Sequence, residues 1–185
     1  MTEATHRLAP LRDGLAERGL VGSHDGRRLR IAVVCARFND EVTLRLLAGA
    51  LSKLDECGVA ASNRLVVWVP GSFELPLAAQ ALAYSGGFDG IVCLGCVIRG
   101  ATPHFDFVAG ECAAGLQRVQ LDTRLPVVLG VLTTENLAQA LERSGGAIGN
   151  KGEEAIETVI EMANVLTDVS VAGASSGSRH RTAPS

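Results

Sequence analysis

The sequence contains no apolar run that approaches the roughly 18 residues needed to cross a lipid bilayer. Its first stretch, MTEATHRLAPLRDGLAERG, mixes acidic and basic residues and has no apolar core of the kind that a secretion signal requires. There is also no excess of basic charge, because 17 lysines and arginines stand against 20 acidic residues. We therefore expect a cytoplasmic protein that has neither a membrane nor a nucleic acid as its partner.

Several signatures of specific chemistry are also absent. No Walker or G-x-G-x-x-G pattern is present, so neither a nucleoside triphosphate nor a dinucleotide is indicated. No cluster of cysteine, histidine and acidic residues has the spacing of a metal site, and no serine lies in a nucleophile-elbow motif. These absences argue against metalloenzymes and serine hydrolases of the common types.

The cysteines do not suggest a disulfide framework, because their number is odd and they lie in apolar segments typical of buried, reduced thiols. The five are Cys35, Cys57, Cys93, Cys96 and Cys112. Cys93 and Cys96 form a C-x-x-C motif, but the surrounding GIVCLGCVI is typical of a β-strand. Residues three apart on a strand point to opposite faces, so we do not expect these two thiols to share a metal.

The chain has 185 residues, of which 47% are hydrophobic and 20% charged, enough to bury the core of one domain. Residues 1–28 lack clear periodicity, and we expect a partly mobile N-terminal arm. Residues 170–185 are mostly small and polar, and we expect a disordered C-terminal tail. The predicted domain therefore covers residues 29–169.

Strand and helix patterns alternate along this domain. Short apolar runs predict strands at 29–38, 64–70, 90–98 and 125–134. Helices are predicted from Asn39 or Asp40 to Gly58, over 73–87, 104–121 and 135–146, and after the AIGNKG stretch. This alternation with short connections predicts a three-layer α/β/α fold around a four-stranded parallel sheet.

Ligands of such sheets bind at the carboxyl ends of the strands. The residues expected at that edge are Phe38, 71–74, 98–104 and 133–136. In VPGSFELP, Ser72 and Glu74 could bind a polyhydroxylated ligand, or they could simply cap the following helix. Phe38 ends its strand where an aromatic ring could stack on a planar ligand.

The stretch GCVIRGATPHFDF holds His104, the only one of the four histidines with predicted folded structure on both sides. Thr102 is a good helix cap and Pro103 suits a first helical position, so a helix N-terminus here offers free N–H groups to a phosphate. His104 then lies beside that anion site, where proton transfer is the stronger interpretation. The alternatives are that Thr102 and Pro103 only start a helix and that His104 is a structural hydrogen-bonding residue. Arg99 could equally form an ion pair.

Six segments together resemble lumazine synthases, which act in riboflavin biosynthesis: ARFND, WVPGSFELP, LGCVIRGATPHFDFV, GVLTTEN, ALERSG and GNKG. The resemblance runs in order from about Arg30 to Leu166. It implies a flavodoxin-like fold and a reaction between two small-molecule substrates. These are 5-amino-6-(D-ribitylamino)uracil and 3,4-dihydroxy-2-butanone 4-phosphate, which yield 6,7-dimethyl-8-ribityllumazine, phosphate and water. The resemblance also implies that no metal or organic cofactor takes part.

The resemblance implies roles for residues around the phosphate. His104 would transfer protons, in agreement with its position beside the expected anion site. Ala101 and Thr102 would bind the phosphate through their backbone N–H groups. Arg143 would pair with the same phosphate. Taken without the resemblance, Arg143 would be interpreted as a solvated charge, as would Lys151.

Other residues would hold the pyrimidine substrate by the same resemblance. Phe38 would stack on its ring, and Lys151 would contact a ring oxygen. The remaining contacts would come from Ser72, Phe73, Glu74, Cys96, Val97 and Ile98. At position 129 the family commonly has phenylalanine, supplied by a neighbouring subunit, whereas this chain has Leu129. Leucine has no π-face, so this stacking contact would be lost.

Members of the family form homopentamers, and in some cases twelve pentamers close into a shell, so self-association is expected here. The alternative function is a non-catalytic flavin or lumazine carrier on the same fold. Retention of both His104 and Arg143 favours catalysis, because a carrier needs no proton-transfer group beside a phosphate-binding arginine.

Overall fold

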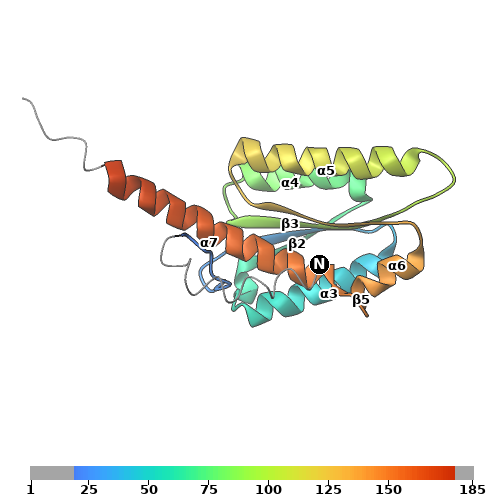
Figure 1. The fold of residues 1–185 in the computed structure, drawn as a ribbon, viewed down its shortest axis with the longest axis horizontal. Coiled ribbons are helices and arrows are strands. Elements are labelled where there is room, and N and C mark those ends of the chain that lie inside the picture. Colours follow the sequence, from blue (N-terminus) through green and yellow to red (C-terminus); the bar gives the residue numbers. More distant parts are fainter. Residues whose placement is uncertain (1–18, 178–185) are drawn as a thin grey trace, which may run out of the picture.

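The computed structural model describes residues 19–177 and places a parallel sheet between two layers of helices (Figure 1). The strands are β1 (Ile31–Ala36), β2 (Arg64–Val69), β3 (Gly90–Ile98) and β4 (Val127–Thr134). Their order in the sheet is β2-β1-β3-β4, and all neighbouring pairs are parallel. The predicted three-layer α/β/α fold with a four-stranded parallel sheet is therefore confirmed.

Helices cover both faces of this sheet. The main ones are α3 (Asp40–Glu56), α4 (Leu75–Tyr84), α5 (His104–Thr123), α6 (Leu137–Glu142) and α7 (Lys151–Gly177), with short 3₁₀ helices η2 (Ala61–Asn63) and η3 (Ser72–Glu74). α4 and α5 lie on one face, whereas α3, α6 and α7 lie on the other (Figure 1). Although α7 is 27 residues long, neither it nor another helix within residues 19–177 is apolar enough to span a membrane.

Each face of the sheet has its own buried core. Cys96 packs in the core under α3 and α7, whereas Cys93 packs in the core under α4 and α5. The two thiols therefore lie on opposite faces of β3, as the strand pattern predicted. All five cysteines are free, and burial raises the pKa of the Cys35 and Cys112 thiols to about 11, so both stay protonated and unreactive at neutral pH.

The helix predicted over 135–146 is correct only in its middle. α6 ends at Glu142, and the chain then forms a small antiparallel pair from β5 (Ser144–Gly146) and β6 (Gly149–Asn150). Gly145 and Gly149 adopt φ values of 111° and 85°, which a helix does not allow and only glycine adopts easily. The glycines therefore form a hairpin, where the sequence suggested only a helix stop.

Both predicted ends of the domain are also revised. Residues 170–177 continue α7, so the helix runs beyond the boundary predicted at 169. The last eight residues of the expected tail, 178–185, lie outside the described residues.

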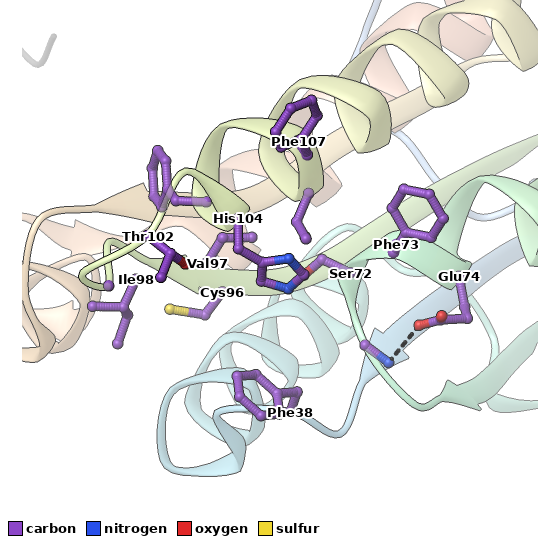
Figure 2. Close-up of a pocket in the computed structure, with 14 residues that line it drawn as sticks. Phe38, Ser72, Phe73, Glu74, Cys96, Val97, Ile98, Thr102, His104 and Phe107 are labelled. Carbon is purple, nitrogen blue, oxygen red and sulfur yellow. Dashed lines mark hydrogen bonds between the residues drawn. The ribbon is translucent and has the colours of Figure 1, made fainter.

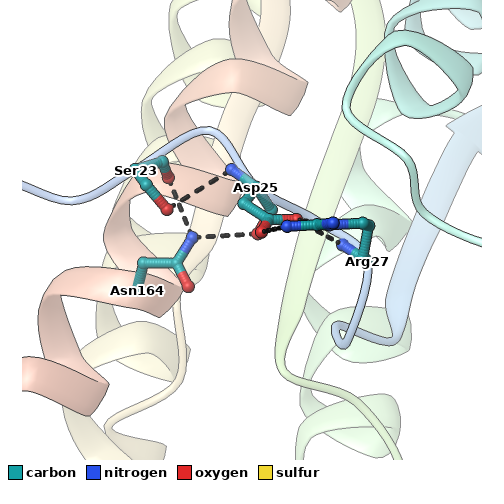
Figure 3. Close-up of polar contacts among 4 residues, drawn as sticks. All are labelled: Ser23, Asp25, Arg27 and Asn164. Atoms are coloured by element: carbon teal, nitrogen blue, oxygen red, sulfur yellow. Dashed lines mark hydrogen bonds and ion pairs between the residues drawn. The ribbon is translucent and has the colours of Figure 1, made fainter.

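The segment before β1 packs along α7 (Figure 3). The side-chain amide of Asn164 donates hydrogen bonds to the carbonyl oxygens of Ser23 and Asp25, at 2.8 and 3.2 Å. The guanidinium of Arg27 pairs with the Asp25 carboxylate at 2.6 Å and lowers the pKa of that carboxyl group. Residues 19–28 thus belong to the folded body, whereas residues 1–18 of the expected arm lie outside the described part of the chain.

Candidate active site

A cavity of about 560 Å³ lies at the carboxyl ends of β1 and β3. Its lining brings together most of the predicted site residues: Phe38, Ser72, Phe73, Glu74, Cys96, Val97, Ile98, Thr102 and His104. Figure 2 shows the His104 ring projecting from the start of α5 into the space between Phe38, Cys96 and Ser72. The size suits a small molecule rather than a macromolecule.

His104 is the first residue of α5. Its imidazole makes no hydrogen bond or ion pair with any residue between 19 and 177, so nothing in this part of the chain supports a purely structural role. An imidazole that is open to the cavity can accept and donate protons to a bound molecule. The arrangement therefore favours the proton-transfer interpretation.

The predicted cap of α5 is wrong by one residue. Pro103 occupies the N-cap position, and no side chain caps the helix, so Thr102 does not act as the sequence suggested. The proline ring restricts φ at Pro103 to a value that suits the start of a helix. The helix therefore begins without a capping hydrogen bond from the Thr102 hydroxyl. Within residues 19–177 the backbone N–H groups of Ala101 and Thr102 donate no hydrogen bond, so both can bind an anion.

Phe38 and Asn39 follow directly after β1. The Phe38 side chain is 70% exposed at the cavity, which leaves its ring free to stack on a planar ligand. Asn39 takes the N-cap position of α3, but its side chain makes no cap hydrogen bond. Instead its amide donates to the carbonyl oxygen of Cys96 at 2.9 Å, which ties the end of β1 to β3.

The η3 turn supplies the other wall of the cavity (Figure 2). An Oε atom of Glu74 accepts a hydrogen bond from the N–H of Gly71 at 3.0 Å, so the carboxylate closes this turn. Ser72 is buried against β3, where a Cβ added at Gly95 would lie 2.5 Å from the Ser72 hydroxyl. Gly95 therefore lets the turn approach the strand closely. Of the two alternatives left open by the sequence, the structure shows Glu74 capping this turn, whereas Gly71 takes the N-cap position suggested for Ser72.

Cys96, Val97 and Ile98 form the cavity floor at the end of β3. Burial raises the pKa of the Cys96 thiol to about 11, so this thiol is neutral and a poor nucleophile near neutral pH. Covalent catalysis by Cys96 is therefore not indicated. The segment offers a ligand backbone groups and apolar surface.

Arg99 forms an ion-pair cluster beside this floor. Its Nε donates to Glu135 at 3.1 Å, its Nη1 lies 3.2 Å from a carboxylate oxygen of Asp106, and its guanidinium lies 4.0 Å from the centroid of the Phe105 ring. Hydrogen bonding to Glu135 is the main cause of a raised pKa for the Arg99 guanidinium. The ion pair suggested by the sequence is confirmed, and it involves two carboxylates.

Leu129, Arg143 and Lys151 line a different cavity, of about 310 Å³, along β4 and the start of α7. Arg143 Nη1 donates to the carbonyl oxygen of Gln139 at 3.0 Å, and the Lys151 ammonium lies 2.7 Å from the Glu154 carboxylate. Neither cation lines the cavity that holds His104. The predicted site residues therefore fall into two groups within one chain.

Asn150 fixes the second group against α3. Its amide donates to the carbonyl oxygen of Arg45 at 2.9 Å, and its Oδ1 accepts from the N–H of Gly152 at 2.8 Å. A Cβ added at Gly152 would lie 2.1 Å from the carbonyl oxygen of Leu46, so no larger residue fits there. The GNKG motif thus seats the start of α7, and with it Lys151, on α3.

Some lining residues were not singled out from the sequence. Phe105, Phe107 and Val108 line the His104 cavity because they share the first two turns of α5. Phe107 and Val108 stand three and four residues after His104, a spacing that places side chains on one helix face, and this was the available signal. Phe105 directly follows His104 and gave no such signal. Asn39 gave no signal, because an asparagine at that position is explained equally well as a helix cap. Within residues 19–177 no group of histidine, cysteine or acidic side chains could hold a metal ion.

Comparison with known proteins identifies the family of this chain. The model of the 6,7-dimethyl-8-ribityllumazine synthase family matches residues 28–167. The chain belongs to this family. It is 51% identical over 144 residues to a lumazine synthase of Protochlamydia amoebophila (strain UWE25), and the alignment covers 78% of this chain and 84% of that protein. The resemblance noted in six sequence segments is confirmed.

Membership of the lumazine synthase family also confirms the flavodoxin-like fold and the choice of an enzyme over a carrier. The family match begins just before β1 and ends within α7, so it spans both groups of site residues.

Proposed function

We propose that this chain, as a lumazine synthase, condenses 5-amino-6-(D-ribitylamino)uracil with 3,4-dihydroxy-2-butanone 4-phosphate in the cytoplasm. The products are 6,7-dimethyl-8-ribityllumazine, inorganic phosphate and water. The observation that carries this proposal is the cavity lined by the His104 imidazole and the exposed Phe38 ring, next to the loop of Ala101 and Thr102. Among residues 19–177 neither this imidazole nor the N–H groups of the two loop residues have a hydrogen-bond partner. These features suit a heterocycle, a phosphate and a series of proton transfers.

The two substrates would occupy opposite ends of the cavity. The pyrimidine would stack on Phe38 and contact the backbone of residues 96–98, with its ribityl chain directed to η3. The phosphate of the ketone would bind the N–H groups of Ala101 and Thr102. Each substrate would then be held with its reacting group facing the other, which converts an encounter in solution into a step within one complex.

His104 would move the protons that this chemistry requires. The amine of the pyrimidine attacks the ketone and forms an imine with loss of water. Phosphate then leaves by elimination, and the second amine attacks the remaining carbonyl carbon and closes the new ring with loss of a second water. Proton transfers accompany these steps. The His104 imidazole projects into the cavity, which would place it between the two proposed substrate positions. Arg143 would stabilise the negative charge on the departing phosphate.

We further propose that the site is completed by a second copy of the chain in a homopentamer. Leu129 is 49% exposed on the edge strand β4, and with Arg143 and Lys151 it lines a cavity separate from that of His104. A head-to-tail ring lets the β4 edge of one copy face the His104 cavity of the next. The number five comes from the family resemblance, and association of pentamers into a shell would use further surfaces. Light scattering would give the mass of the assembly.

The reaction is tested directly by mixing the purified protein with both substrates. Phosphate release and growth of lumazine fluorescence should both exceed the rates in buffer and increase in proportion to protein concentration. If the pyrimidine binds but neither signal exceeds the buffer rate, the protein is a carrier and the proposed reaction is wrong.

Replacing Leu129 by phenylalanine is expected to tighten binding of the pyrimidine about threefold to tenfold. The new ring would cover the face of the heterocycle opposite Phe38, and an aromatic pair stabilises a complex by about 1 kcal/mol beyond burial. Titration of the pyrimidine against both proteins measures the change. Leu129→Met is the matched control, because it preserves apolar volume without a π-face. Equal affinity for the Phe and Met variants would contradict stacking from this position.

A further inference from the structure

Arg99 contacts both segments that flank the loop of residues 100–103. Its backbone N–H donates to the carbonyl oxygen of Thr134 at 2.9 Å, which fixes the residue at the end of β3. Its side chain reaches Asp106 in the first turn of α5 and Glu135 in the turn after β4. One guanidinium therefore links the start of the loop, the helix that follows it and the adjacent strand end.

The 100–103 loop has few restraints of its own. Within residues 19–177 the backbone N–H groups of Gly100, Ala101 and Thr102 donate no hydrogen bond, and all three residues are exposed. A Cβ added at Gly100 would meet no atom within 4 Å. Packing therefore does not determine the shape of the loop, and the contacts at its two ends must do so.

We propose that Arg99 is a positioning residue that holds the 100–103 loop in the shape that binds the phosphate of the ketone substrate. This inference rests on the proposed placement of the phosphate at Ala101 and Thr102. With Asp106 and Glu135 both held by one guanidinium, the start of α5 is anchored to the ends of β3 and β4. The same anchor sets the position of His104, which lies between the loop and Asp106.

A direct phosphate contact by Arg99 does not fit the geometry as well. Nε and Nη1 each contact a carboxylate and the flat face of the guanidinium lies over Phe105, which leaves Nη2 as the one nitrogen without a contact among residues 19–177. The two carboxylates also place negative charge beside the guanidinium, which disfavours an anion at the same point. The guanidinium therefore acts on the phosphate through the loop.

The two carboxylates provide a test in which charge and positioning predict opposite results. Removing negative charge near an anion site strengthens anion binding if charge alone matters. If positioning matters, Glu135→Gln and Asp106→Asn both weaken phosphate binding, because each releases one end of the loop. Arg99→Gln should weaken it most, and Arg99→Lys should recover part of the loss through a single ion pair.

The experiment measures competitive inhibition by inorganic phosphate, KM for the ketone and the Kd of the pyrimidine, with the full chain in its native assembly. For Arg99→Gln we expect the inhibition constant of phosphate and the KM for the ketone to rise about tenfold. The Kd of the pyrimidine should stay within about twofold. Arg118→Gln is the control, because this exposed arginine lies on α5 away from the loop. Its constants should match those of the unmodified protein. Thermal unfolding should change little, since exposed ion pairs contribute little to stability.

The outcomes separate the two proposals. If phosphate does not inhibit the unmodified enzyme, the phosphate placement itself is wrong. If phosphate inhibits the unmodified enzyme and Arg99→Gln equally, the positioning role is wrong while the placement stands. Tighter phosphate binding in Glu135→Gln and Asp106→Asn would also contradict the positioning role of Arg99. An equal loss of phosphate and pyrimidine binding in Arg99→Gln would contradict it as well.

Discussion

Replacing Arg143 by alanine is expected to lower kcat/KM for the ketone phosphate about a hundredfold. A guanidinium that pairs with a departing phosphate stabilises charge at the point where it develops, and loss of one such donor typically costs a factor of about 10² to 10³. Steady-state kinetics with the ketone as the varied substrate measures the effect. Arg143→Lys should recover part of the rate, because it retains the charge but not the bidentate geometry.

Affinity for the pyrimidine serves as the internal control for this variant. Arg143 is proposed to contact the phosphate of the ketone and not the pyrimidine, so the Kd of the pyrimidine should be nearly unchanged. If Arg143→Ala kept the full kcat/KM, the residue would be an ordinary solvated cation and the phosphate role would be wrong.

Replacing His104 by alanine is expected to lower kcat about tenfold to a hundredfold, at or below the lower end of the range for general acid–base catalysis. The effect is limited because His104 is exposed at the cavity, so water can replace the imidazole in proton transfer. Rates of phosphate release and of lumazine formation, followed in parallel, measure the change. Both should fall together, because proton transfers accompany the steps on either side of phosphate loss.

His104→Asn is the matched variant, because its amide can form hydrogen bonds but cannot transfer a proton near neutral pH. It should be as slow as His104→Ala. A rate close to that of the unmodified enzyme would assign His104 a hydrogen-bonding role and contradict proton transfer.

The sheet and one wall of the site could be predicted from sequence because both follow from local rules. Short apolar runs separated by helical patterns specify a parallel sheet, and the carboxyl ends of its strands bring Phe38 and His104 to one edge. The apolar periodicity of α3, α5 and α7 is strong because each helix buries one face.

Other features depend on backbone geometry or on contacts between distant residues. The β5–β6 hairpin requires positive φ at Gly145 and Gly149, whereas the sequence around them is equally compatible with a helix stop. The Asn39 amide binds the Cys96 carbonyl instead of capping α3, which requires knowledge that the two chain segments meet. The local sequence pattern contains no information about contacts between distant segments.

The division of the site into two cavities was also beyond local sequence patterns. Motifs predict which residues take part, but not whether one chain can bring them together. Arg143 is placed by α6 and by the hairpin that follows it, and Lys151 is placed by the contact of Asn150 with α3. α6 and the start of α7 both follow β4 in the sequence. Both lie on the opposite face of the sheet from α5. The roles proposed for Arg143 and Lys151 would therefore require a second copy of the chain.

Co-expression of His104→Ala with Arg143→Ala tests most directly whether two copies share each site. In a head-to-tail ring assembled at random from equal amounts, about a quarter of the junctions would pair an intact His104 with an intact Arg143. We predict that the mixed assembly recovers about a quarter of the unmodified activity, well above either variant alone. Activity no higher than the average of the two separate variants would contradict a site shared between neighbouring copies.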